Sequence, residues 1–200
     1  MIEVAEEKEL IMRSCSAVNK LIRRELWKES GFQFPKGRYY EDLATIPKVM
    51  TKTKKIVYLP EVYYYYLMRD GSIMHSRNFE KNYEDRTWAV DQLLEYFERE
   101  NLIETYRNEL EYLVFENTYF VPSKEIVLND RKSEYLKKFR DYAYNKFPQM
   151  NKNYYVQQIA GKDKILLKLL QYRMYGMMVL MSQSVSYTHL RAHETSLHLV

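Results

Sequence analysis

The stretch that most constrains this chain covers residues 31–43 and reads Gly-Phe-Gln-Phe-Pro-Lys-Gly-Arg-Tyr-Tyr-Glu-Asp-Leu. Gly31 predicts a helix end, because glycine adopts the left-handed backbone conformation at little cost. Pro35 and Gly37 then predict a turn. Two adjacent carboxylates, Glu41 and Asp42, follow where the next helix is expected to begin. The chain must therefore reverse between two helices at this point.

The two carboxylates have two interpretations. Acidic side chains are favoured in the first turn of a helix, where they offset its dipole and bind free backbone N–H groups. Alternatively, one of them is a functional carboxylate that points into a pocket. The opposed pair of a glycosidase is excluded, because its carboxylates lie about 5 to 9 Å apart across a bond. Neighbours on one helix instead diverge by about 100°.

Composition narrows the class of protein. Two hundred residues with 46% hydrophobic content are enough for a domain with a core. The net charge of +4 arises from 31 basic and 27 acidic residues, a balance too even to define a nucleic-acid-binding protein. Cys15 is the only cysteine, which excludes an internal disulfide and a cysteine-built zinc site. The single cysteine therefore predicts a cytoplasmic location. No run of about 18 consecutive apolar residues occurs, so no membrane-spanning helix is predicted.

The expected secondary structure is mostly helical with a few short strands. Strands are predicted where β-branched and aromatic residues cluster, and helices where apolar residues recur every three to four positions. The predicted strands cover residues 17–22, 55–59 and 62–68, and the predicted helices cover 2–12, 23–29, 40–54, 79–121 with a break at Asn101, 131–146 and 162–181.

Several short motifs follow one another between residues 15 and 78. They are Asn-Lys-Leu-Ile-Arg-Arg-Glu-Leu (19–26), Phe-Pro-Lys-Gly (34–37), Tyr-Glu-Asp-Leu (40–43), Lys-Lys-Ile-Val-Tyr (54–58), Val-Tyr-Tyr-Tyr (62–65) and Arg-Asp-Gly-Ser-Ile (69–73). In order and spacing, this region resembles the C-terminal half of a bacterial family 2 glycosyltransferase with a GT-A fold. The fold class that follows is α+β and mostly helical, with a partial GT-A half and then a helical extension.

The resemblance also implies a reaction and its residues. An inverting enzyme of this family transfers a sugar from a nucleotide-sugar donor to a surface glycan acceptor. Asp42 is then the catalytic base that takes the proton of an acceptor hydroxyl, and Glu41 orients the site or binds the acceptor. Arg69, Ser72 and His75 are the implied contacts of the donor diphosphate, where cations and hydroxyls stabilise a leaving anion.

The chain departs from the family in what it lacks. Family members carry a nucleotide-binding βαβ half and an Asp-x-Asp motif that holds Mn²⁺ or Mg²⁺, and this sequence contains no Asp-x-Asp. We therefore expect residues 1–78 to be the acceptor-side half without its donor-binding half, 79–184 a helical extension, and 185–200 a disordered tail that resembles translated sequencing adapter. Such a fragment is expected to be inactive and to bind no metal. A second acidic pair, Glu84 and Asp85, is interpreted as the polar face of a helix.

Residues 162–181 leave a second hypothesis open. Their leucines and methionines alternate with lysines, and a basic amphipathic helix of this kind can lie on an anionic membrane leaflet at the inner face of the membrane. It can equally close a helical bundle with its lysines at the rim. The alternative function is thus a non-enzymatic helical interaction module peripheral to the membrane. Binding to nucleic acid is not expected, because the positive charges are scattered rather than striped.

Overall fold

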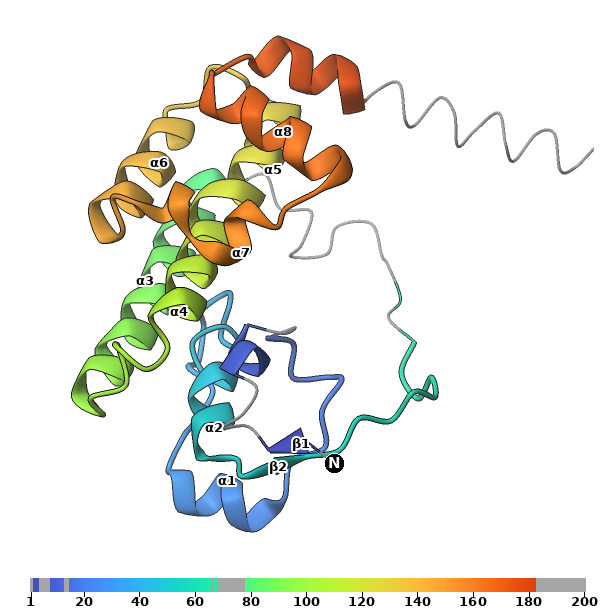
Figure 1. The fold of residues 1–200 in the computed structure, drawn as a ribbon, viewed down its shortest axis with the longest axis vertical. Helices are drawn as coiled ribbons and strands as arrows, with labels where there is room; N and C mark the ends of the chain where they lie inside the picture. The colour runs from blue at the N-terminus through green and yellow to red at the C-terminus, as the bar shows by residue number, and fades with distance from the viewer. Residues whose placement is uncertain (1, 4–7, 13–14, 66, 68–77, 183–200) are drawn as a thin grey trace, which may run out of the picture.

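The protein is mostly helical, as the computed structural model shows (Figure 1). The structure describes residues 2–3, 8–12, 15–65, 67 and 78–182. Its helices are η1 (Lys8–Ile11), α1 (Arg24–Ser30), α2 (Ile46–Lys52), α3 (Phe79–Arg99), α4 (Arg107–Phe115), η3 (Glu116–Phe120), α5 (Val121–Asn129), α6 (Tyr135–Lys146), η4 (Met150–Lys152), α7 (Tyr154–Gln157) and α8 (Gly161–Gln171), and residues 175–182 form a further helical segment. Among the described helices, none is both long and apolar enough to cross a bilayer.

The helices from α3 onward form one packed group, and the N-terminal elements attach to it (Figure 1). Helix α6 packs on α3, α4 and α5, and α7 packs on α4. On the N-terminal side, α2 contacts α3, and η1 contacts both α2 and α4. The carboxylates of residues 41 and 42 therefore lie immediately before a helix that rests on the main helical group.

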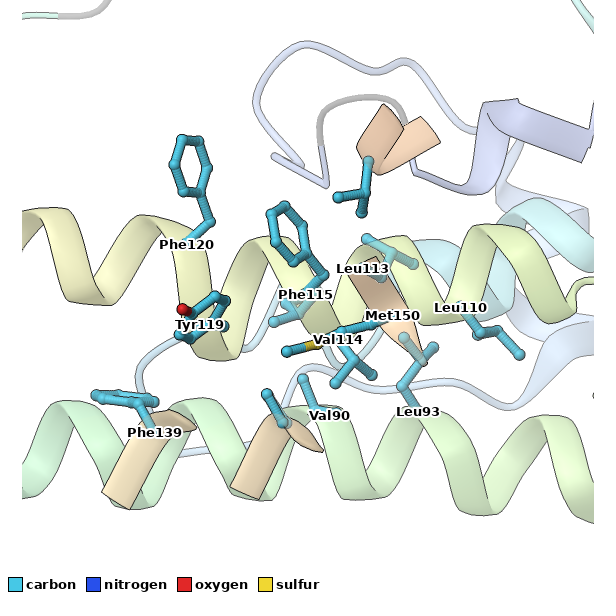
Figure 2. Packing of buried hydrophobic residues seen from close by; sticks show 14 of the residues in the cluster. Val90, Leu93, Leu110, Leu113, Val114, Phe115, Tyr119, Phe120, Phe139 and Met150 are labelled. Carbon is cyan, nitrogen blue, oxygen red and sulfur yellow. The ribbon is translucent and has the colours of Figure 1, made fainter. Parts of the chain in front are cut away.

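The core lies between α3 and the run of helix from α4 to α5 (Figure 2). Val90 and Leu93 of α3 face Val114 of α4, and each of these side chains is at most 1% exposed. The largest fully buried side chains include three aromatic ones, Phe97, Phe115 and Phe139. Buried aliphatic and aromatic surface of this extent is the main source of stability for the helical group.

A π-helical turn lies within the continuous helix that runs from α4 to α5. Helix α4, the π-helical η3 and α5 follow one another without a break, and Pro122 stands in the first turn of α5. Pro122 carries no N–H, so one carbonyl of the preceding turn loses its donor. The carbonyl of Asn117 instead accepts a hydrogen bond from Nη1 of Arg86, at 3.4 Å. The helix therefore continues through Pro122, beyond the end at residue 121 that the sequence predicted.

The predicted strands are mostly wrong. Residues 17–22 form a turn and a loop, in which the N–H of Lys20 donates to the carbonyl of Ala17. Within the described chain, the only paired strands are β1 (Ile2–Glu3) and β2 (Lys55–Ile56), which run antiparallel with Ile2 opposite Ile56. Residues 57–65 are not in a strand. High β-propensity does not form a strand without a partner for its backbone groups.

Two predicted helices are also shorter than expected. In place of the helix expected over 2–12, the described residues hold β1 and the short η1. Residues 41–45 form hydrogen-bonded turns, and α2 begins only at Ile46. Pro47 therefore lies in the first turn of α2, where a missing N–H costs nothing, rather than in the middle of a helix. The predicted breaks at Gly31 and Asn101 are confirmed by left-handed φ values of 69° and 56°.

Gly31→Ala is expected to lower the free energy of unfolding by about 1 kcal/mol, because an added Cβ disfavours the left-handed conformation. Urea denaturation at 25 °C measures the effect. Gly176→Ala is the matched control, since Gly176 lies in a helical segment and an added Cβ would meet only Nη1 of Arg131, at 3.5 Å. The control should be neutral or slightly stabilising, and equal losses in both variants would contradict the role of the Gly31 backbone.

Candidate functional site

Residues 38–40, called the bend below, lie directly before Glu41 and Asp42. A buried carboxylate of α3 holds this bend in place. The side chain of Asp85 is 1% exposed and accepts hydrogen bonds from Nη1 of Arg38 (2.9 Å), Nζ of Lys81 (2.8 Å) and the backbone N–H of Tyr39 (3.1 Å). Burial by itself raises the pKa of Asp85, but the bonds from Lys81, Arg38 and the Tyr39 N–H together lower it below its usual range. Asp85 is thus an ionised anchor for the bend.

This position of Asp85 corrects the interpretation of the second acidic pair. Only Glu84 is exposed, whereas Asp85 faces the bend. The local pattern offered one signal, since Lys81 lies four residues before Asp85 and can pair with it on one helix face. The contact with Arg38 spans 47 positions and has no local signature.

A second residue of α3 holds the other side of the bend. Arg86 is 3% exposed, and its Cζ lies 4.4 Å from the ring centroid of Tyr40. Its Nη2 also donates to Oε2 of Glu125, at 2.8 Å. Tyr40 has a φ of 61°, a conformation that costs energy for a residue with a Cβ. The buried guanidinium against its ring compensates for this strain and fixes the backbone just before Glu41.

Asp42 is half-buried in the turn before α2, while Glu41 is exposed. Oδ1 of Asp42 accepts the N–H of Leu43 at 2.8 Å, and its backbone carbonyl accepts the N–H of Ile46 at 2.8 Å. Burial raises the pKa of Asp42, the hydrogen bond from Leu43 opposes the rise, and the charge of Glu41 adds to it. The carboxylate therefore holds a proton more tightly than an exposed aspartate does.

Other titratable side chains share the surroundings of Asp42. Burial raises the pKa of the Cys15 thiol to about 12, and the charges of Asp42 and Glu116 contribute. Burial lowers the pKa of Lys20, while Cys15 and Asp42 oppose that change. The thiol of Cys15 stays protonated at neutral pH, so it is not a nucleophile there. Burial raises the pKa values of both Asp42 and Glu116 toward neutrality, and of these two carboxylates Asp42 is the one that lies on the turn before α2.

The predicted donor contacts Arg69, Ser72 and His75 lie outside the described residues. Residues 57–65, which precede them, are described, and in Figure 1 they lead away from the packed helices. Strands were predicted over 55–59 and 62–68, but the large apolar side chains of residues 57–65 and 67 are exposed rather than packed. They are Val57, Tyr58, Leu59, Val62, Tyr63, Tyr64, Tyr65 and Leu67.

The divalent cation that the resemblance implies for an intact enzyme does not fit the residues present. Within the described ranges, no three or more histidine, cysteine, aspartate or glutamate side chains come together in a group that could hold a metal ion. The sequence also lacks an Asp-x-Asp motif. A hard cation of this kind needs several oxygen ligands held around one point.

Comparison of the chain with protein-family models, curated proteins and solved structures finds no match. A functional inference therefore starts from the bend itself. Its distinctive features are a half-buried carboxylate with a raised pKa and two buried charged residues of α3 that hold the backbone in front of it.

Proposed function

We propose that the chain is the acceptor-side part of an inverting glycosyltransferase and that Asp42 is its general base. Residues 15–78 would be the C-terminal part of a GT-A α/β fold, with Arg69, Ser72 and His75 toward the donor diphosphate and Glu41 toward the acceptor. The observation that carries the proposal is the raised pKa of the half-buried Asp42 carboxylate on a rigidly held bend. Alone, the chain is expected to transfer no sugar.

The proposed chemistry is a single displacement. Asp42 accepts the proton of an acceptor hydroxyl while the hydroxyl oxygen forms a bond to the anomeric carbon of the donor sugar. The bond from that carbon to the nucleoside diphosphate breaks on the opposite face, so the configuration inverts. A carboxylate whose pKa is raised by burial is a stronger base than an exposed one, and the hydrogen bonds of Asp85 keep its bend in place.

Binding of acceptor sugars tests the proposal. Methyl glycosides of common hexoses are titrated into the isotope-labelled chain, and the amide resonance of Leu43 is followed, because this N–H donates to Asp42. We expect a saturable shift in the wild-type protein that is lost in Asp42→Asn and retained in Glu84→Gln, a variant of an exposed carboxylate. Absence of a shift with every glycoside would contradict the acceptor site. Release of nucleoside diphosphate that Asp42→Asn abolishes would contradict the expected inactivity.

Asp42→Asn is also expected to raise the thermal midpoint at pH 7. A carboxyl whose pKa is higher in the folded than in the unfolded state contributes stability that is fully present below its unfolded pKa of about 3.9. That contribution is lost as pH rises through the folded-state pKa. The difference in thermal midpoint between Asp42→Asn and the wild-type protein should therefore be larger at pH 7 than at pH 4.

The two interpretations of Asp42 predict opposite signs. If the carboxylate served mainly to offset the dipole of α2, its neutralisation would destabilise the protein by about 0.3–1 kcal/mol. Asparagine keeps an oxygen that can accept the Leu43 N–H, and it removes the charge by replacing the other carboxylate oxygen with an NH2 group. A lower midpoint for Asp42→Asn at pH 7 would favour the capping role. A higher midpoint is typical of a group placed for chemistry rather than for stability.

A second candidate function is favoured by the exposed apolar side chains of the C-terminal helices. Ile165, Met174, Met177 and Leu180 are between 43% and 67% exposed. A non-enzymatic helical module peripheral to an anionic membrane would use such side chains together with nearby lysines. Flotation of the full chain with anionic vesicles tests this candidate, and a protein that stays at the bottom of the gradient would exclude it.

A further inference from the structure

A surface groove lies where the end of α5 meets the helical segment 175–182. Its volume is about 500 Å³, and Leu128, Arg131, Met177, Val179 and Leu180 are among the residues that line it. Gly176 also lines the groove, and Nη1 of Arg131 lies 3.5 Å from the position that a Cβ would take there. The Arg131 side chain therefore borders the groove beside Gly176, at a distance that would be an ordinary van der Waals contact for a Cβ.

The groove exposes large apolar side chains. Leu128, Met177 and Leu180 are 53%, 50% and 67% exposed, whereas the neighbouring Met178 is 2% exposed and belongs to the core. The segment 175–182 therefore has one face packed on the protein and one face open. An apolar patch of this kind, bordered by charged residues, is typical of a surface that binds something.

Basic side chains outnumber acidic ones in the parts of the sequence on either side of the groove residues. Residues 127–132 and 161–182 contain six basic side chains, which are Arg131, Lys132, Lys162, Lys164, Lys168 and Arg173. The same ranges contain two acidic side chains, Asp130 and Asp163, and both already accept hydrogen bonds within the protein. In the part of the chain that the structure describes, neither Arg131 nor Arg173 forms an ion pair.

We propose that this groove docks the protein on an anionic lipid bilayer. Leu128, Met177 and Leu180 enter the boundary between headgroups and acyl chains, and Arg131 and Arg173 contact lipid phosphates. A bilayer supplies apolar surface and negative charge within a few ångströms of each other, which complements both features of the groove. Flexible methionine side chains suit an irregular acyl surface. The inference rests on the second candidate function and gives it a site, independent of Asp42.

The experiment measures partitioning of the full-length chain onto vesicles. Neutral phosphatidylcholine vesicles are compared with vesicles that contain phosphatidylglycerol, and we expect binding to the anionic vesicles that weakens as salt is raised. Met177→Ser with Leu180→Ser should reduce the partition coefficient by about 20-fold, because two apolar side chains lose their burial. Arg131→Gln and Arg173→Gln should each reduce it by about fivefold.

Matched variants on other surfaces serve as controls. Val62→Ser replaces an apolar side chain that is 69% exposed, and Arg23→Gln removes an exposed cation, so neither should change partitioning. Equal losses in the controls, or equal binding to neutral vesicles, would overturn the proposal. Binding that the groove variants leave intact would place the membrane contact elsewhere and keep only the second candidate function. If the wild-type protein binds no vesicles, both the groove proposal and the second candidate function are overturned. If the protein is a dimer that Met177→Ser with Leu180→Ser dissociates without a change in partitioning, the groove is a subunit interface instead.

Discussion

Phe115→Ala is expected to lower the free energy of unfolding by about 4 kcal/mol. Phe115 is fully buried at the junction of α4 and η3, and its ring stacks on Phe120 with centroids 5.6 Å apart. The rings of Tyr112 and Tyr119 lie 6.0 Å away on other sides. The substitution leaves a cavity among large rings that cannot collapse into it, so the lost contacts add to the lost burial.

Urea denaturation at 25 °C measures this loss, and Tyr172→Ala provides its control. Tyr172 is 77% exposed, so its removal should change stability by less than about 0.5 kcal/mol. Both substitutions remove an aromatic ring, and only the first removes a buried one. A loss below about 1 kcal/mol for Phe115→Ala would contradict the packing of η3 on the core.

Asp85→Asn is expected to cost about 2 kcal/mol at pH 7. The amide cannot accept all the hydrogen bonds that Arg38, Lys81 and the Tyr39 N–H donate to the carboxylate. The cost stays below that of a fully buried ion pair, because the side chains of Arg38 and Lys81 are 42% and 36% exposed and return to water. Since the bend leads to Asp42, the variant should also weaken the shift of Leu43 with glycosides.

The pH dependence of the stability loss distinguishes the removal of an ionised carboxylate at Asp85 from a general disturbance of packing by the substitution. The folded-state pKa of Asp85 is lowered, so its contribution is present above the unfolded pKa and is lost as pH falls through the folded-state value. The gap between Asp85→Asn and the wild-type protein should therefore narrow as pH falls below about 4. Glu84→Gln, a change in the exposed neighbour, should match the wild-type protein throughout. A gap that is constant from pH 7 to pH 3 would contradict the ionised anchor.

The fold was predictable where local physics decides it. Regular apolar spacing predicted α3, α4 and α6, and the left-handed backbone at Gly31 and Asn101 confirmed the ends of α1 and α3. Helices α5 and α7 were not predicted, and the helix expected over 162–181 is broken at Arg173, which has a φ of 57°. The strands were not predictable, because β-propensity describes a surface that fits a neighbour, and the described chain supplies a neighbour only for Lys55 and Ile56. The π turn at η3 was also missed, since one extra residue in a helical turn hardly changes the apolar spacing.

The residues of the candidate site also differ in whether the sequence alone could identify them. The turn residues and paired acids made Asp42 visible, because its signal lies within a dozen neighbouring positions. Asp85 and Arg86 were not, because their contacts with Arg38 and Tyr40 join segments more than 40 positions apart. Whether Asp42 acts in catalysis stays a prediction, as do the roles of Arg69, Ser72 and His75.

The exposed apolar side chains of residues 57–65 and 67 have a consequence for how the protein behaves at high concentration. Exposed runs of valine, leucine and tyrosine favour intermolecular β-pairing and aggregation. Pro60 and Glu61 stand near the middle of this run. A proline removes a donor from any β-ladder that forms there, and a glutamate repels the glutamate of a second copy, so these two residues oppose aggregation.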